Sequence, residues 1–276
     1  MNGHIIPGEI TCQSILNKTG IPGYDYCLNP YVGCTHACAY CYASFMCRFS
    51  GHKEKWGEFL DVKVNAAQVL SKQLSRRSHP TGKVIVGTVT DAYQPVEASY
   101  NITRSCLQLL AEYQLLEVDI LTKSALVERD VTVLQRLPAC KVGFTVTTID
   151  SRIARVMEPR ASAPIRRMEA AQKLVQAGIP VWIFIAPLLP GLTDRHEILK
   201  DMLLRFRQAG VEEVLVDCLN PYPAVVHRLK AVYRQYFPHA LPALEDYMRR
   251  PSGYETMVQG LLQQLNTSTG CKAELA

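Results

Sequence analysis

Three cysteines, Cys34, Cys38 and Cys41, lie close together in the segment NPYVGCTHACAYCYASF. Clustered thiolates are typical metal ligands, and a structural zinc site or an electron-carrying iron–sulfur cluster usually takes four of them. Three thiolates on a [4Fe-4S] cluster leave one iron without a protein ligand, so that iron can bind another molecule. The spacing C-x3-C-x2-C therefore predicts a cluster that supplies an electron and also holds the molecule that receives it.

A structural zinc ion or a closed cluster in a non-catalytic protein is the alternative interpretation. Zinc sites commonly combine two separated ligand pairs, and only Cys38 and Cys41 form a C-x2-C pair here. His36, Cys27 or Cys47 could complete such a site. Metal-ligand spacing alone does not choose between these metals.

The composition indicates the environment of this site. The chain has 276 residues, a formal charge of +5 and ten cysteines, and five of the cysteines fall between residues 27 and 47. The N-terminus has no basic segment followed by an apolar one, so we expect no secretory signal and a reducing, cytoplasmic location, where clustered cysteines favour metal over disulfides. The longest apolar run is interrupted by prolines and is shorter than the roughly 20 residues of a membrane span. The mild positive charge allows an anionic partner without requiring one.

The elements that must position the cysteines alternate between strands and helices. Apolar, β-branched runs predict strands at 24–31, 83–89, 117–123, 141–147, 180–186 and 211–219, and helical patterns fall at 64–74, 103–113, 128–137, 164–178 and 193–210. Such alternation is typical of a parallel sheet covered by helices. We expect an α/β fold, a partial, open (β/α)6 TIM-like barrel, with a flat doubly wound sheet as the alternative. The strands are expected to stop near residue 220, which divides a catalytic domain, 1–220, from a helical C-terminal extension, 221–276.

Together these features resemble a known family. The cysteine motif, with Tyr40 before the last cysteine and a predicted strand before the loop, resembles the radical S-adenosylmethionine (SAM) superfamily. The segments TDAYQPVE (90–97), LTKS (121–124) and EPRAS (158–162) make the chain most similar to the spore photoproduct lyase-like subgroup, over roughly residues 24 to 220. The resemblance implies a [4Fe-4S] cluster on the three cysteines with SAM on its open iron. It also implies cleavage of SAM to methionine and a 5′-deoxyadenosyl radical that abstracts hydrogen from an unidentified substrate, nucleic acid being one class. The electron would come from a donor such as a flavodoxin or ferredoxin.

Polar residues at the ends of the predicted strands are candidate SAM contacts. Thr145 and Thr147 share one face of their strand, where two hydroxyls suit a ribose diol, and Lys123 ends the third strand, where an ammonium suits a carboxylate. The resemblance implies these SAM contacts and places Tyr40 near the adenine. Ordinary strand preference of threonine and a solvated lysine are the alternatives.

Acidic and hydroxyl groups are the candidates for the SAM ammonium. Many superfamily members carry a Gly-Gly-Glu triplet after the second strand, and this chain has none. Thr90, Asp91 and Glu97 could supply acceptors there instead. Glu158 is expected to contact SAM or substrate, with a surface ion pair as the alternative.

Cys218, at the end of the sixth predicted strand, is a candidate hydrogen-atom donor to a substrate radical. Spore photoproduct lyase uses a cysteine on a different strand for that role, and residues 83–93 contain none. The alternative is a buried core cysteine. Strand alternation places Val216 and Cys218 on one face and Asp217 on the other, so we expect only one of the two neighbours, Asp217 or Cys218, to face the cavity.

Overall fold

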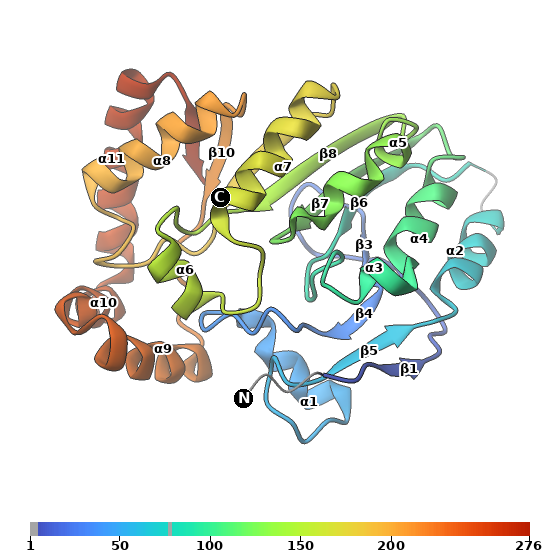
Figure 1. The fold of residues 1–276 in the computed structure, drawn as a ribbon, viewed down its shortest axis with the longest axis horizontal. Coiled ribbons are helices and arrows are strands. Elements are labelled where there is room, and N and C mark those ends of the chain that lie inside the picture. Colours follow the sequence, from blue (N-terminus) through green and yellow to red (C-terminus); the bar gives the residue numbers. More distant parts are fainter. Residues whose placement is uncertain (1–4, 77–78) are drawn as a thin grey trace.

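A computed structural model describes residues 5–76 and 79–276. The expectation of no secretory signal rests partly on residues 1–4, outside the described residues. An eight-stranded sheet with the order β11-β10-β9-β8-β7-β6-β3-β2 forms the centre of the molecule (Figure 1). Its strands are β2 (Leu16–Lys18), β3 (Tyr26–Leu28), β6 (Gly82–Val86), β7 (Leu116–Thr122), β8 (Ala139–Thr145), β9 (Val181–Ile185), β10 (Glu213–Val216) and β11 (Lys272–Leu275).

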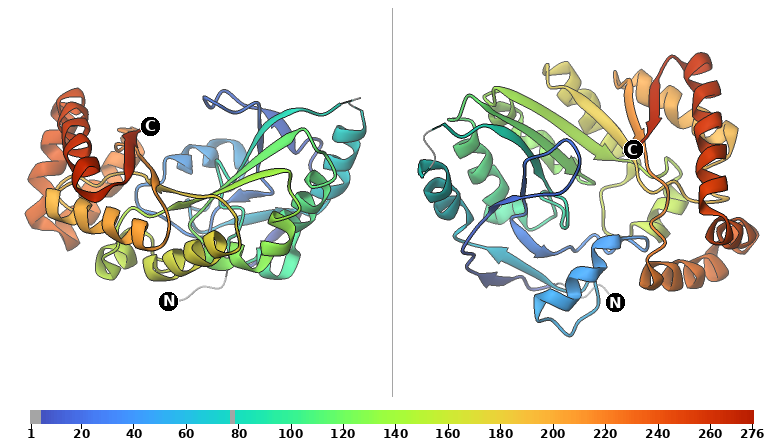
Figure 2. Two further views of the ribbon diagram at one scale, coloured as in Figure 1. Left: turned by 90° about the horizontal axis from the view of Figure 1, so that it is seen from above. Right: turned by 180° about the vertical axis from the view of Figure 1, so that it is seen from behind.

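The six predicted strands are confirmed as β3, β6, β7, β8, β9 and β10. Each pairs in parallel with the next in chain order. The central residues of β6, β7, β8 and β9 are almost completely buried, because helices cover the sheet, whereas Cys27 in β3 is half-buried. The partial, open barrel is thus confirmed, and Figure 2 shows its curvature from two further directions.

A second, three-stranded sheet was not predicted. It consists of β1 (Gly8–Ile10), β4 (Tyr31–Gly33) and β5 (Leu60–Lys63), in the order β1-β5-β4. The predicted strand 24–31 is therefore two strands in different sheets: β3 belongs to the barrel, whereas β4 pairs with β5. Strands of three or four residues are too short to show a clear periodicity. The chain enters the cysteine loop from β4, not from the barrel sheet.

Helices lie between the successive strands from β4 to β10. They are α1 (Cys47–Ser50), α2 (Ala66–Ser75), α3 (Glu97–Tyr100), α4 (Ile102–Leu110), α5 (Val131–Leu134), α6 (Ser151–Met157), α7 (Pro164–Gln176) and α8 (His196–Gln208), with 3-10 turns η1 (Tyr42–Met46) and η2 (Ala125–Asp130). Helix α7 starts with Pro164 at its first position, which suits proline because it lacks an N–H. The predicted helix at 128–137 is mostly the 3-10 turn η2 and the short helix α5.

The C-terminal extension contains α9 (Pro223–Tyr236), η3 (Pro238–Ala240), α10 (Leu241–Arg249) and α11 (Pro251–Thr269). The helical tail is confirmed, but the expectation that strands stop near residue 220 is wrong, because β11 pairs in parallel with β10. Helix α11 brings the chain back to the edge of the barrel sheet. Ala273 and Leu275, two residues apart on one face of β11, lie beside that edge. Among the described residues, no helix has the length and apolar character that a bilayer span requires.

Two hydrophobic cores hold these layers together. The larger lies between the barrel sheet and its helices. The smaller joins Cys38, Ala39 and Tyr40 of the cysteine loop to Leu229 and Tyr233 of α9, among other residues. The proposed division at residue 220 stays a prediction, and the cysteine loop shares a core with the extension.

Candidate active site

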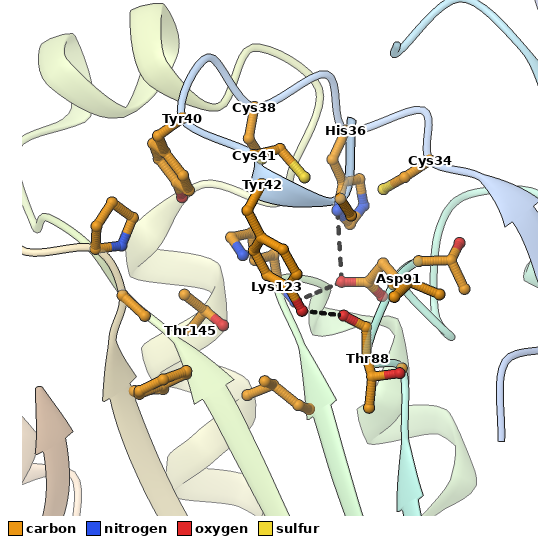
Figure 3. A pocket seen from close by; sticks show the side chains of 18 of the residues that line it. Cys34, His36, Cys38, Tyr40, Cys41, Tyr42, Thr88, Asp91, Lys123 and Thr145 are labelled. Carbon is orange, nitrogen blue, oxygen red and sulfur yellow. Dashed lines mark hydrogen bonds and ion pairs between the residues drawn. The ribbon is translucent and has the colours of Figure 1, made fainter. Parts of the chain in front are cut away.

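A cavity lies at the carboxyl ends of the parallel barrel strands, next to the cysteine loop (Figure 3). It contains about 880 Å³ of empty space, part of it open to solvent. Five successive strands contribute residues to its lining: Gly87 to Asp91 after β6, Lys123 after β7, Thr145 at the end of β8, Ala186 and Pro187 after β9, and Asp217 and Cys218 after β10. This end of a parallel sheet is where α/β enzymes bind their ligands.

The three motif cysteines all line this cavity as free thiols, whereas Cys27 and Cys47 are absent from its lining. Burial raises the pKa of Cys34 to about 12, with Asp91 and Cys41 acting in the same direction. Burial likewise raises the pKa of Cys38 well above its ordinary value. A bound cation stabilises thiolates, so metal binding would offset the free-energy cost of deprotonating these buried thiols.

All three cysteine side chains border the same cavity (Figure 3). Within residues 5–76 and 79–276, no three His, Cys, Asp or Glu side chains are close enough to hold one metal ion. A single zinc ion needs its sulfur ligands about 2.3 Å from one centre. A cluster spreads its thiolates over several irons, so it does not require three ligands around one centre.

Contacts from distant parts of the chain hold the cysteine loop. The backbone N–H of Ala39 donates to Met157 at 2.8 Å, and the N–H of Thr35 donates to the Gln94 side chain at 2.9 Å. Arg228 of α9 donates from Nε to the Ala39 carbonyl and from Nη2 to the Cys41 carbonyl, the latter at 3.0 Å. The loop is thus fixed by the barrel and by the C-terminal extension together.

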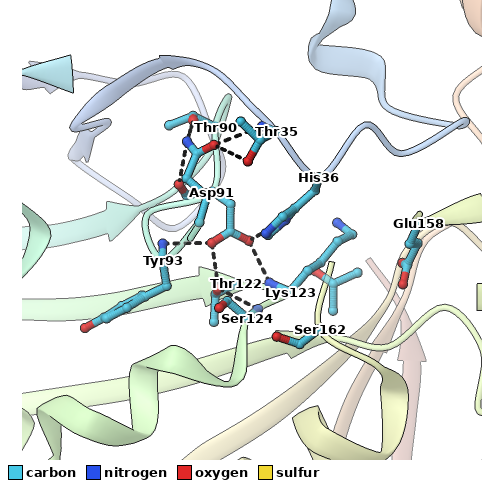
Figure 4. A network of polar contacts seen from close by, with 12 residues as sticks. Thr35, His36, Thr90, Asp91, Tyr93, Thr122, Lys123, Ser124, Glu158 and Ser162 are labelled. Atoms are coloured by element: carbon cyan, nitrogen blue, oxygen red, sulfur yellow. Dashed lines mark hydrogen bonds and ion pairs between the residues drawn. The ribbon is translucent and has the colours of Figure 1, made fainter. Parts of the chain in front are cut away.

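Asp91 is the centre of a buried polar network (Figure 4). Its carboxylate accepts from the N–H of Tyr93 at 2.8 Å, the hydroxyl of Thr122 at 2.7 Å and the N–H of Lys123 at 2.7 Å. His36 Nδ1 lies 3.5 Å from the same carboxylate. Asp91 thereby joins the loop after β6 to the end of β7, and it lines the cavity as well.

Thr90 also combines a cavity position with a contact to the loop. Its hydroxyl donates to the Gly33 carbonyl, directly before Cys34, at 2.5 Å. The turn that carries Thr90 begins at Gly87, which has φ +91°, and a Cβ there would lie 2.6 Å from the Leu121 carbonyl oxygen. Only glycine fits this turn without strain.

A chain of charged and hydroxyl groups runs from the cavity lining, where Lys123 and Tyr40 lie, to Glu158 and Arg167 behind it. Lys123 Nζ is 5.7 Å from the centre of the Tyr40 ring. The Tyr40 hydroxyl donates to Glu158 and lies 3.2 Å from the Thr147 hydroxyl. Glu158 in turn pairs with Arg167, and the side chains of both are only 1% exposed. Tyr40 thus connects the cysteine loop to a buried ion pair.

Lys123 is the cation that faces the cavity from this group. Burial opposes its charge, but Cys38, Glu158 and Cys41 outweigh burial and raise its pKa. The side chain therefore stays protonated at neutral pH. A half-buried ammonium in a ligand cavity is suited to bind a carboxylate.

The two candidate threonines differ in position. Thr145 is buried and lines the cavity. Thr147 lies beyond the end of β8, is absent from the lining, and donates its hydroxyl to the Ala186 carbonyl at 3.0 Å. Because β8 ends at Thr145, the strand-face argument does not reach Thr147, and a shared contact of both threonines with SAM stays a prediction.

Glu97 and Glu158 lie outside the cavity lining. The Glu97 carboxylate accepts from the Tyr31 hydroxyl, from the N–H of Thr103 at 2.9 Å and from Arg129 at 2.7 Å. It anchors the start of α4. Glu158 is buried in its pair with Arg167, which contradicts the alternative of a surface ion pair.

Asp217 and Cys218 both line the cavity. The expectation that only one of them could face it is wrong, because β10 ends at Val216 and alternation ceases there. Burial raises the pKa of the Cys218 thiol to about 12, with Glu255 and Asp217 adding to the effect. Cys218 is thus a neutral thiol in the same cavity as the three motif cysteines.

Sequence reasoning missed Arg167, Arg228 and the cavity-lining Trp56. A signal existed for Arg167: it shares the buried face of α7 with Ala170, Ala171 and Leu174, and an arginine in an apolar stripe indicates a buried partner. Arg228 lies in a helix with no comparable local signal.

Comparisons with known proteins agree with this geometry. The chain matches the profile of the radical SAM superfamily over residues 28–203. It is 34% identical over 199 residues to an uncharacterized protein of Methanocaldococcus jannaschii, covering 72% of this chain and 74% of that protein.

Solved structures share the fold. A variant of spore photoproduct lyase with bound AdoMet and dinucleoside spore photoproduct superimposes with a TM-score of 0.64 at 14% identity, over 97% of this chain and 80% of that one. Streptococcus suis SuiB bound to its precursor peptide SuiA gives 0.55 at 15% identity, over 91% and 47%. Membership of this superfamily implies SAM and an iron–sulfur cluster as cofactors. The chain belongs to the radical SAM superfamily of enzymes.

Proposed function

We propose that this protein holds a [4Fe-4S] cluster on Cys34, Cys38 and Cys41 and uses it to cleave SAM reductively. The observation that carries the proposal is the single cavity lined both by these thiols and by the carboxyl ends of five parallel strands. When bound, the cluster supplies one electron, received from a donor such as a flavodoxin or ferredoxin, to generate a 5′-deoxyadenosyl radical that removes hydrogen from substrate.

The cavity residues divide the task of holding SAM. Lys123, protonated and facing the cavity, binds the carboxylate. Thr90 and Asp91 provide acceptors for the ammonium, although both already bind neighbouring groups. Thr145 contacts the ribose. Tyr40, Thr147, Glu158 and Glu97 support these groups and the cysteine loop, since their polar atoms are engaged within the protein.

Cys218, which lines the same cavity, returns a hydrogen atom to a substrate radical in this proposal. Its S–H bond breaks homolytically as a C–H bond forms, leaving a thiyl radical that a one-electron reductant and a proton restore. The thiol form is the one required, and burial favours it by raising the pKa of Cys218.

The substrate class is open between two types seen in proteins of this fold. The spore photoproduct lyase variant holds a dinucleoside spore photoproduct, and SuiB holds a precursor peptide. Residues 227–254 combine basic and aromatic side chains, but Tyr233 and Tyr247 are buried in the smaller core and cannot stack on bases.

Anaerobic reconstitution with iron and sulfide tests the proposal. We expect visible absorbance typical of an iron–sulfur cluster and, after addition of dithionite and SAM, 5′-deoxyadenosine detected by mass spectrometry. A variant with alanine at all three cysteines is the control. A colourless protein containing zinc would refute the cluster, and an intact reduced cluster that yields no 5′-deoxyadenosine would refute SAM cleavage. Deuterium exchange in anaerobic cell extracts would then search for the substrate.

A further inference from the structure

Arg228 connects the C-terminal extension to the cysteine loop across a sequence separation of 187 to 189 residues. Its guanidinium donates to two carbonyls, those of Ala39 and Cys41, which flank Tyr40. The two bonds leave from Nε and Nη2, the neighbouring donors on one edge of the planar guanidinium group. A lysine ammonium has no such fixed fork.

Helix α9, which carries Arg228, is fixed in place by buried packing. Leu229 and Tyr233 are completely buried in the smaller core, which also contains Cys38, Ala39 and Tyr40. The Tyr233 hydroxyl donates to the Pro190 carbonyl at 3.1 Å. The loop and the arginine are therefore held in register by apolar packing as well as by the two hydrogen bonds.

The charge of Arg228 is close to the ligand cysteines. Burial lowers its pKa, opposed by its interaction with Cys41, Cys38 and Cys47, and a guanidinium remains protonated at any pH used for proteins. Hydrogen bonds and charge next to an iron–sulfur cluster set its reduction potential. A nearby positive charge favours the reduced form, because that form is more negative.

We propose that Arg228 is a positioning residue of the cluster site, one that fixes the Cys38–Cys41 segment from the C-terminal extension and raises the reduction potential of the bound cluster. The inference rests on the proposed function, since it needs a cluster on the three cysteines. It assigns the extension a part in cofactor binding that its sequence does not reveal.

Three variants separate the two effects. Arg228→Gln removes the charge and the two-pronged contact, Arg228→Lys keeps the charge alone, and Arg234→Gln removes an exposed positive charge from the same helix. Two quantities are measured on each reconstituted protein: the rate of cluster loss to an iron chelator, from visible absorbance, and the midpoint potential, from an anaerobic redox titration. Melting of the apo proteins ensures that all are folded at the assay temperature.

Both Arg228 variants should lose the cluster about tenfold faster or more, the range typical of residues that orient metal ligands. Arg228→Gln should also have a lower midpoint potential, whereas Arg228→Lys and Arg234→Gln should titrate like the wild type. Cluster loss from Arg228→Gln at the wild-type rate, or an unchanged potential in that variant, would overturn the inference. If the wild-type protein binds no cluster, the proposed function itself fails. That outcome is distinct from failure of the Arg228 inference, which is judged on a wild-type protein that binds a cluster.

Discussion

Replacing Arg167 with methionine should be among the most damaging single changes to this fold. The substitution keeps an unbranched apolar side chain and removes the charge that pairs with Glu158. It also removes donors to the Ser162 and Thr145 carbonyls, at 2.7 and 2.8 Å. Breaking one partner of a buried ion pair costs about 3–5 kcal/mol, and each orphaned carbonyl adds about 1 kcal/mol. Since Lys123 still offsets part of the Glu158 charge, we expect a loss of about 5 kcal/mol.

The assay is urea unfolding of the apo protein under reducing conditions, followed by circular dichroism and extrapolated to water. The neighbouring Arg166 is a matched control, because its partners Glu169 and Glu128 are on the surface. Arg166→Met should lower the unfolding free energy by less than about 1 kcal/mol. Combining Arg167→Met with Glu158→Gln should restore about 1–3 kcal/mol relative to Arg167→Met alone, since no charge is then stranded.

The pH dependence of stability is a second test of the Glu158–Arg167 ion pair. Burial raises the pKa of Glu158, but Arg167 and then Lys123 outweigh it, so the native pKa is lowered. The stability from this carboxylate is present above its unfolded pKa and is lost as pH falls through the lower native value. Without Arg167, burial dominates and raises the pKa of Glu158. Protonation of Glu158 then relieves the buried charge in Arg167→Met, so the difference in unfolding free energy between wild type and this variant should shrink from neutral to mildly acidic pH. Equal stabilities of Arg167→Met and Arg166→Met, or a double variant no more stable than Arg167→Met, would refute the reasoning.

Three other predictions concern the cavity. Alanine at Cys34, Cys38 or Cys41 should abolish cluster absorbance after reconstitution, and alanine at Cys27 or Cys47 should leave it, because only the first three line the cavity; a full cluster in Cys38→Ala would contradict this. Lys123→Met should weaken SAM binding to the oxidised, reconstituted protein about tenfold or more in calorimetry, the effect of losing a charge-assisted hydrogen bond, while the exposed Lys173→Met serves as control. Because burial raises the pKa of Cys218 to about 12, its alkylation, followed by peptide mass spectrometry, should still rise with pH well above 9; a plateau near 9, as for an ordinary thiol, would contradict the burial.

Features with a local pattern were predictable from the sequence, and features that depend on distant contacts were not. The six barrel strands appear as apolar runs because most of their residues are buried in the core, and the cysteine motif is contained in one loop. The partners of Arg228 come from the distant cysteine loop. Glu158 is only nine residues before Arg167 but lies outside α7, and no local pattern pairs the two. Thr147 and Asp217 were assigned to strand faces because the sequence gives no clear end for β8 or β10. Single-residue boundaries of this kind depend on tertiary hydrogen bonds.

The pairing of β11 with β10 has a consequence for how the protein is made. Residues 272–275 leave the ribosome after every other strand of the sheet. Until they arrive, β10 presents a row of unpaired backbone groups, the kind of edge that templates aggregation. Parallel pairing over long sequence separations also forms slowly. During synthesis, the edge of β10, directly before Asp217 and Cys218, therefore stays open to non-native strand pairing longer than the other strands. Folding of this protein in the cell should depend most on protection of that edge.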